Sequence, residues 1–155
     1  MTCVLRAYGE KFNVDDFLPR SHLVPCKVWH RGEPRFPSGR GGNWSHSGMN
    51  VDVSDAELED LPRQIRDAMR FLRRNQVDLK KIGVYPGLQA LFLDFGVARQ
   101  PDALMQGAYF PANLVRACGE LGIGLKVSEY AVKEDDQPRS RRRVAGGPKS
   151  RRRTT

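Results

Sequence analysis

Long apolar runs and a secretion signal are what this chain of 155 residues most plainly lacks. No stretch approaches the roughly 20 apolar residues that a membrane-spanning helix needs. The opening residues, MTCVLRAYGEK, contain no apolar run of signal-peptide length. We therefore expect a soluble, cytoplasmic protein that does not interact with a membrane.

Cysteine and histidine are also scarce. Cys3, Cys26 and Cys118 are too few and too irregularly spaced for a disulfide framework or a zinc site. Each lies in an apolar stretch, which predicts three small, buried core side chains and a reducing compartment. The histidines lack the helical spacing of metal ligands, and they are His22, His30 and His46. We predict neither a metal nor a cofactor.

Acidic residues are missing from position 138 to the end of the chain. Eight of the 26 lysines and arginines lie there, so 18 remain to balance the 18 acidic residues of the preceding chain. The net charge of +8 therefore belongs to a tail. We expect one domain over residues 1–134 and a disordered, Arg-rich tail over 135–155, because Gly, Pro, Ser and Arg cannot build a core. The basic tail residues are Arg139, Arg141, Arg142, Arg143, Lys149, Arg151, Arg152 and Arg153.

Two roles are open for this tail. Basic side chains on a flexible arm bind nucleic acid nonspecifically at low salt, because neutralised phosphates release counterions. No aromatic residue interleaves the arginines, so the tail offers no base stacking. The other role is that of a solubilising segment without a specific partner.

The spacing of apolar residues predicts the secondary structure of the domain. Alternating patterns predict strands at 2–8, 23–30 and 49–53, a run that is apolar on both faces predicts a central strand at 88–95, and a final strand is expected at 123–132. Three- and four-residue spacing predicts two longer helices, at 54–75 and 111–121, and a short helix follows Asn13. We predict an α+β fold: a mainly antiparallel sheet of about five strands with these helices packed on it.

The first long helix carries a basic ridge beside its apolar stripe. Ser54 and Glu57 form a capping-box pattern that predicts where the helix begins, and Pro62 divides a first turn from the rest. The ridge arginines fall within an arc of about 100°. They could meet phosphates or an acidic partner, or could form an ordinary solvated face. They are Arg63, Arg66, Arg70, Arg73 and Arg74.

A glycine-rich stretch, RFPSGRGGNWSHSG, precedes the third expected strand. A phosphate loop would end in lysine and open a helix, whereas this stretch opens a strand, so we expect a flexible hairpin loop. An exposed tryptophan beside arginines is typical of a binding anchor, although Trp44 could equally be a core residue. The candidate contact residues are Arg35, Arg40, Trp44 and His46.

No catalytic signature is evident. The chain contains no GxSxG turn, and the acids of the expected strands are scattered. Asp94 lies in an apolar strand and could be a perturbed buried acid, although a carboxylate bonded to backbone is the simpler reading. We predict a protein that is not an enzyme. The alternative is a small enzyme with a pocket near His46 and Asp52.

Several segments together resemble a known family. They are LRAYG, G…GNWSHSG, VDVSDAELEDL, LQALFLDFGV and FPANLVRACGELGIGLKVSEY. In this order, over residues 2 to 132, they resemble small bacterial domains of unknown function related to the immunity proteins of polymorphic toxin systems. The resemblance implies a single α+β domain, and places Trp44 and the last strand within its fold. It implies no site residues and does not extend to the tail.

The leading hypothesis is a non-enzymatic, immunity-type protein that neutralises a partner toxin by stoichiometric binding. The alternative is a nucleic-acid-associated accessory protein that uses its Arg-rich tail, with the ridge arginines giving a docking direction. Neither the partner nor the oligomeric state follows from the sequence.

Overall fold

A five-stranded sheet organises the molecule, as seen in a computed structural model that describes residues 2–99 and 104–131. The strands are β1 (Cys3–Gly9), β2 (Lys27–Trp29), β3 (Ser47–Ser54), β4 (Ala90–Arg99) and β5 (Gly124–Ala131). Their order is β2-β3-β1-β4-β5, and only β4 and β5 run parallel. The predicted α+β fold with a mainly antiparallel sheet is confirmed. The predicted disorder of the 135–155 tail lies outside the described residues.

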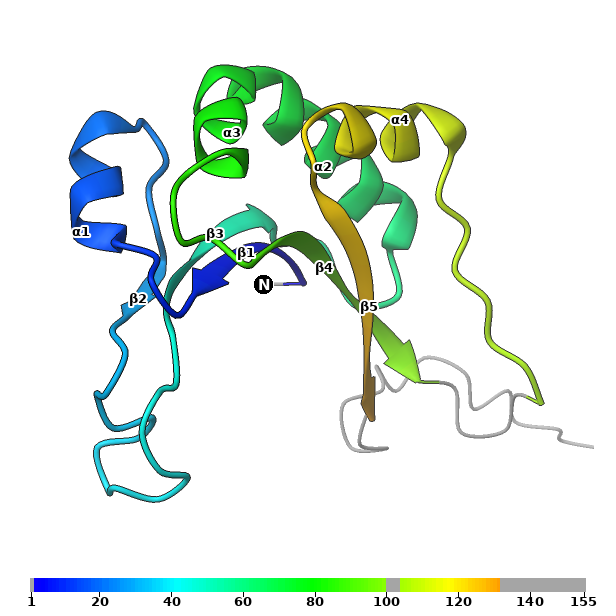
Figure 1. Cartoon of the computed structure of the whole chain (residues 1–155). Helices are drawn as coiled ribbons and strands as arrows, with labels where there is room; N and C mark the ends of the chain where they lie inside the picture. The colour runs from blue at the N-terminus through cyan, green and yellow to red at the C-terminus, as the bar shows by residue number, and fades with distance from the viewer. Residues whose placement is uncertain (1, 100–103, 132–155) are drawn as a thin grey trace, which may run out of the picture.

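The helices all pack on the same side of this sheet (Figure 1). They are α1 (Val14–Phe17), which continues into a 3-10 turn (Leu18–Arg20), α2 (Leu61–Arg74), α3 (Gln76–Gly83) and α4 (Ala112–Glu120). Helix α3 was not predicted. It begins where Asn75 interrupts the longer helix, with its side-chain amide donating to the Phe71 carbonyl at 3.0 Å. α4 connects the two parallel strands, and Gly122 ends it at φ +67° as expected.

The predicted start of the long helix at Ser54 is wrong. Ser54 is the last residue of β3, and α2 begins at Leu61 after a loop. Asp60 caps α2, since its carboxylate accepts a hydrogen bond from the Arg63 backbone N–H at 3.0 Å. The sheet takes precedence over the capping-box pattern because the Ser54 carbonyl accepts from the Thr2 N–H at 3.1 Å.

The predicted second strand is much shorter than expected. Only Lys27–Trp29 pairs with β3, although the apolar alternation begins at Leu23. Two polar contacts divert the backbone: Ser21 Oγ accepts from the Leu23 N–H at 3.0 Å, and a carboxylate of Asp78 accepts from the His22 N–H at 3.0 Å. Because β2 is so short, the outer side of β3 is left open beyond Asn50 within the described chain.

The cysteines divide into two kinds. Cys3 and Cys118 are buried, as predicted, and burial raises the pKa of the Cys118 thiol to about 11 and that of Cys3 further. The prediction is wrong for Cys26, which is exposed beside the open edge of β3. Its thiol contacts the Asn50 carbonyl at 3.4 Å.

The glycine-rich loop joins two antiparallel strands, as predicted. A single bridge between Pro34 and Asn43 closes its base. Gly39, Gly41 and Gly42 have φ values of 69°, 86° and 69°, which only glycine adopts readily.

Alternation along the strands divides the sheet into a covered face and an open face. Leu5 of β1 and Leu93 and Phe95 of β4 are 0 % exposed beneath the helices. Arg6 and Tyr8 alternate with them on β1 and lie half-buried on the opposite face. No helix packs on that open face in the part of the chain that the structure describes (Figure 1). None of the described helices is both long and apolar enough to cross a membrane.

Candidate functional site

A groove lies between α2 and the outer edge of β3. Its volume is about 1150 Å³, which is larger than most small-molecule pockets. Leu23, Val24 and Phe71 supply apolar surface. The arginines that line it come from the predicted ridge, and they are Arg63, Arg70, Arg73 and Arg74.

Among the described residues, no strand pairs with the edge of β3 inside the groove. The Cys26 N–H donates to the Asn50 carbonyl at 2.9 Å, so the peptide groups of Asn50 face the outer edge of β3 and not β1. Peptide groups two residues apart in a strand point the same way, and therefore the backbone of Asp52 also faces outward. β2 does not reach Asp52, since its last partner in this direction is Asn50. An extended chain could add to this edge.

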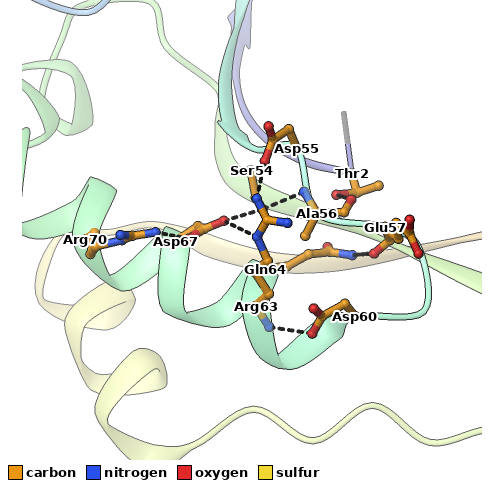
Figure 2. A network of polar contacts seen from close by, with 10 residues as sticks. All are labelled: Thr2, Ser54, Asp55, Ala56, Glu57, Asp60, Arg63, Gln64, Asp67 and Arg70. Carbon is orange, nitrogen blue, oxygen red and sulfur yellow. Dashed lines mark hydrogen bonds and ion pairs between the residues drawn. The ribbon is translucent and has the colours of Figure 1, made fainter.

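Asp67 connects the helix to the end of β3. The Ser54 hydroxyl donates to its carboxylate at 2.7 Å, and Arg70 pairs with the other oxygen. Arg63 lies 3.9 Å away (Figure 2). The Ser54 hydrogen bond, helped by Arg70 and Arg63, holds the pKa of Asp67 below its ordinary value despite burial. This carboxylate therefore stays charged and positions two of the groove arginines.

Two further contacts fix the start of α2 against the sheet. The Arg63 guanidinium pairs with Asp55 at 2.9 Å. The Gln64 amide is fully buried and donates to the Glu57 carbonyl at 3.2 Å and the Gly96 carbonyl at 2.8 Å. Figure 2 shows this network around the loop that leads from β3 into α2. The helix wall of the groove is therefore rigidly attached to β3 and β4.

The opposite wall is the segment around His22, which α3 holds in place. Asp78 is buried and accepts from the His22 N–H at 3.0 Å, while Lys81 lies 3.1 Å from its other oxygen. Burial alone would raise the pKa of Asp78, but the bonds from His22 and Lys81 outweigh it and lower the pKa. Val24 next to this anchor is 79 % exposed.

The ridge arginines differ in their partners. Arg63 and Arg70 pair with acids, whereas neither Arg73 nor Arg74 forms an ion pair among the described residues. Arg66 is exposed and does not line the groove. Among the described residues, the groove thus combines two arginines without an ion pair, one aspartate without an ion pair (Asp52), apolar walls and a strand edge that no other strand covers. This combination suits an extended chain that carries negative charge.

The contact residues predicted in the glycine-rich loop lie elsewhere, on the open face of the sheet. Trp44 is half-buried and stacks on Trp29 with ring centroids 5.1 Å apart, so it is both a packed residue and a partly accessible one. The Arg35 guanidinium lies 5.0 Å from the Trp44 ring. His46 packs on Tyr8 at 4.5 Å. Arg40 is exposed.

The structure does not bring His46 and Asp52 into one pocket. Asp52 lines the groove, but His46 does not. The two residues are about 20 Å apart along an extended chain. Burial, followed by the charge of Arg35, lowers the pKa of His46. No group of three or more His, Cys, Asp or Glu side chains that could hold a metal ion occurs in residues 2–99 and 104–131.

Asp94 is buried, but side chains rather than backbone groups surround it. Arg6 pairs with it at 2.8 Å, the Ser128 hydroxyl donates at 2.6 Å, and Lys126 lies 3.6 Å away. The expectation of a carboxylate bonded to backbone is therefore wrong. These partners come from β1 and β5, the two strands that pair with β4. They meet because of the register between the strands, since they lie far apart in the sequence.

Comparisons with protein-family models, with curated proteins and with solved structures found no match to this chain.

Sequence reasoning identified the arginine ridge but missed the residues that position it. The sequence shows Asp67 only as an acidic residue on the same helix, without its contact to Ser54. It predicts Ser54 as the cap of that helix and not as the partner of Asp67. It also missed that Tyr8 and Phe92 share the open face, where their rings pack edge to face with centroids 6.1 Å apart. The alternation of polar and apolar residues in β1 was the available signal for Tyr8, whereas β4 is apolar on both faces and concealed Phe92.

Proposed function

We propose that this protein is a non-catalytic binding protein whose groove takes an extended, acidic segment of a protein partner. The observation that carries the proposal is the position of Arg73 and Arg74. They lie without acidic partners, among the described residues, beside a strand edge that no other strand covers. Backbone hydrogen bonds at the edge would give affinity, and the arginines would select acidic side chains.

The resemblance to immunity-type proteins supports a toxin as the partner. An inhibitor of this class acts by occupying its target stoichiometrically, which requires a preformed surface rather than a reactive group. The groove has that character, because Asp67 and Gln64 fix one wall and Asp78 fixes the other. Preorganised walls reduce the entropy lost on binding.

The test uses the full chain and a labelled peptide of alternating valine and glutamate, which is extended and acidic on one side. Charge reversal of the free cations, Arg73→Glu with Arg74→Glu, should weaken binding about tenfold or more, because attraction becomes repulsion at both positions. Fluorescence anisotropy measures the affinity. The matched control is Arg66→Glu with Arg116→Glu, which also reverses two exposed arginines but outside the groove, and it should alter affinity less than about twofold.

Equal losses in the two variants would contradict the groove assignment, since they would indicate general attraction to a basic protein. The toxin hypothesis is tested separately by capture from the native cytoplasm. A single toxin-like protein that the wild-type chain retains after nuclease treatment, and that the Arg73→Glu, Arg74→Glu chain loses while the Arg66→Glu, Arg116→Glu chain keeps it, supports that hypothesis. Capture of no protein by the wild-type chain contradicts the hypothesis, and retention by all three chains contradicts the groove assignment.

A further inference from the structure

The open face of the sheet carries a continuous file of aromatic rings. Successive rings from Trp44 through His46 and Tyr8 to Phe92 have centroid separations of 5.8, 4.5 and 6.1 Å. The file begins in the segment before β3, crosses β1 and ends on β4. All four side chains are only partly buried. Each side chain therefore keeps part of its surface in solvent. They lie on a face of the sheet that no helix covers in the described part of the chain (Figure 1).

Cations flank both ends of this file. Lys27 and Arg35 lie 5.4 and 5.0 Å from the Trp44 ring. At the other end, the Lys126 ammonium lies 5.8 Å from the Phe92 ring. Between them, the negative charge of Asp94 is buried and is matched by Arg6 at 2.8 Å. The accessible surface thus presents aromatic faces between positive charges.

A hollow of about 540 Å³ lies at the Phe92 end of the file, bordered by Tyr8, Phe92, Gly124 and Lys126. Gly124 stands opposite Phe92 in the register of β4 and β5. A Cβ at Gly124 would lie 3.3 Å from the Cβ of Phe92. Because glycine has no side chain to cover the Phe92 ring, the hollow stays open to a flat group that stacks on it.

We infer that this open face binds single-stranded nucleic acid, with unpaired bases stacking on Trp44, Tyr8 and Phe92 and phosphates meeting Lys27, Arg35 and Lys126. Aromatic rings flanked by cations favour this ligand over an acidic peptide. Nucleotides offer bases that stack on the rings and phosphates that pair with the cations, whereas carboxylates pair with the cations only. A duplex keeps its bases paired and cannot use the rings. The face is separate from the groove, so the inference stands independently of the proposed function.

Salt separates the two contributions that the inference assigns to this face. The contribution of the phosphate contacts falls steeply as salt rises, whereas stacking persists.

The first experiment uses the two tryptophans of the chain, Trp29 and Trp44, which stack on each other within this face. The full chain is titrated with oligothymidylate of about 12 nucleotides and, separately, with a duplex of equal length. Bases that stack on Trp44 should quench the intrinsic fluorescence, and the duplex should not. Saturating oligothymidylate binding without any change in tryptophan emission would overturn the inference. Equal quenching by the valine–glutamate peptide would overturn it too, because the face would then be a general anion site.

Variants in the full chain provide the second measurement. Tyr8→Leu with Trp44→Leu keeps apolar volume but removes two stacking faces, and should weaken oligothymidylate binding at least about fivefold at about 200 mM salt. Tyr109→Leu, at an aromatic residue that is 79 % exposed outside the face, is the matched control and should leave affinity unchanged. If the double variant does not fold, Lys126→Glu tests the same surface, because the side chain of Lys126 is 54 % exposed. Unchanged affinity in a folded variant of this face contradicts the inference.

Discussion

The two faces of the sheet share the same strands but differ in what their side chains contact. On the covered face, Leu5, Leu93 and Phe95 are completely buried beneath helices. On the open face, Tyr8 and Phe92 are half-buried. Their rings pack edge to face and keep part of their surface in solvent. The comparison shows that alternation assigns one face of each strand to stability and leaves the other available for recognition.

The largest loss of stability should come from substitutions at two phenylalanines of β4, Phe95 and Phe92, which lie on opposite faces of the sheet. Phe95→Ala on the covered face should lower the free energy of unfolding by about 3–5 kcal/mol, because it leaves a cavity under the helices. Phe92→Ala on the open face should cost about 1 kcal/mol, since its ring is only partly removed from water. Denaturant unfolding of the two variants measures both values. Equal losses would show that the open face is as much a part of the core as the covered one.

A smaller effect is expected from two glycine substitutions. A Cβ at Gly48, on the open face, would lie 2.7 Å from the Ala7 carbonyl oxygen and would also strike the Trp29 ring. Gly48→Ala should therefore destabilise the protein by about 1–3 kcal/mol and change tryptophan emission. Gly119 in α4 has open space around its Cβ position, so Gly119→Ala should stabilise by about 0.5 kcal/mol. Thermal unfolding distinguishes the signs, and two effects of the same sign would contradict the packing described for Gly48.

The smallest destabilisation should come from a change at Asp67, whose carboxylate accepts a hydrogen bond from the Ser54 hydroxyl. Its pKa is lowered in the folded state by the Ser54 hydrogen bond and by Arg70. Its stabilising contribution is therefore fully present above the ordinary aspartate pKa of about 3.9 and is lost as pH falls through the lower folded value. Asp67→Asn should cost about 1 kcal/mol or less at neutral pH, because solvent screens the exposed arginine.

The measurement for Asp67 is the stability of wild type and variant between neutral and acidic pH. The difference between the two proteins should shrink as the solution becomes more acidic. A constant difference over that range would show that the charge of Asp67 is not what connects α2 to the end of β3.

Local pattern in the chain was sufficient for most elements of the fold. The alternation in β1 and β3 and the apolar stripe of α2 arise from residues a few positions apart, so they can be read without knowing the sheet order. Errors occurred where a distant partner competes with a local signal. The Thr2 N–H donates to the Ser54 carbonyl, so Ser54 belongs to the sheet and the helix starts later than predicted. The His22 N–H donates to the Asp78 carboxylate, and the second strand is shorter as a result.

The arginine ridge, the segregation of positive charge into the tail and the tryptophan beside arginines follow from the order of residues alone. The groove, the Arg6–Asp94–Lys126 cluster and the Trp44–Phe92 file do not, since their members lie on strands or helices far apart in the chain. Strand order and register decide which of those side chains meet. Register depends on the burial of the whole covered face, where a slip of one residue would exchange core and solvent sides at every position.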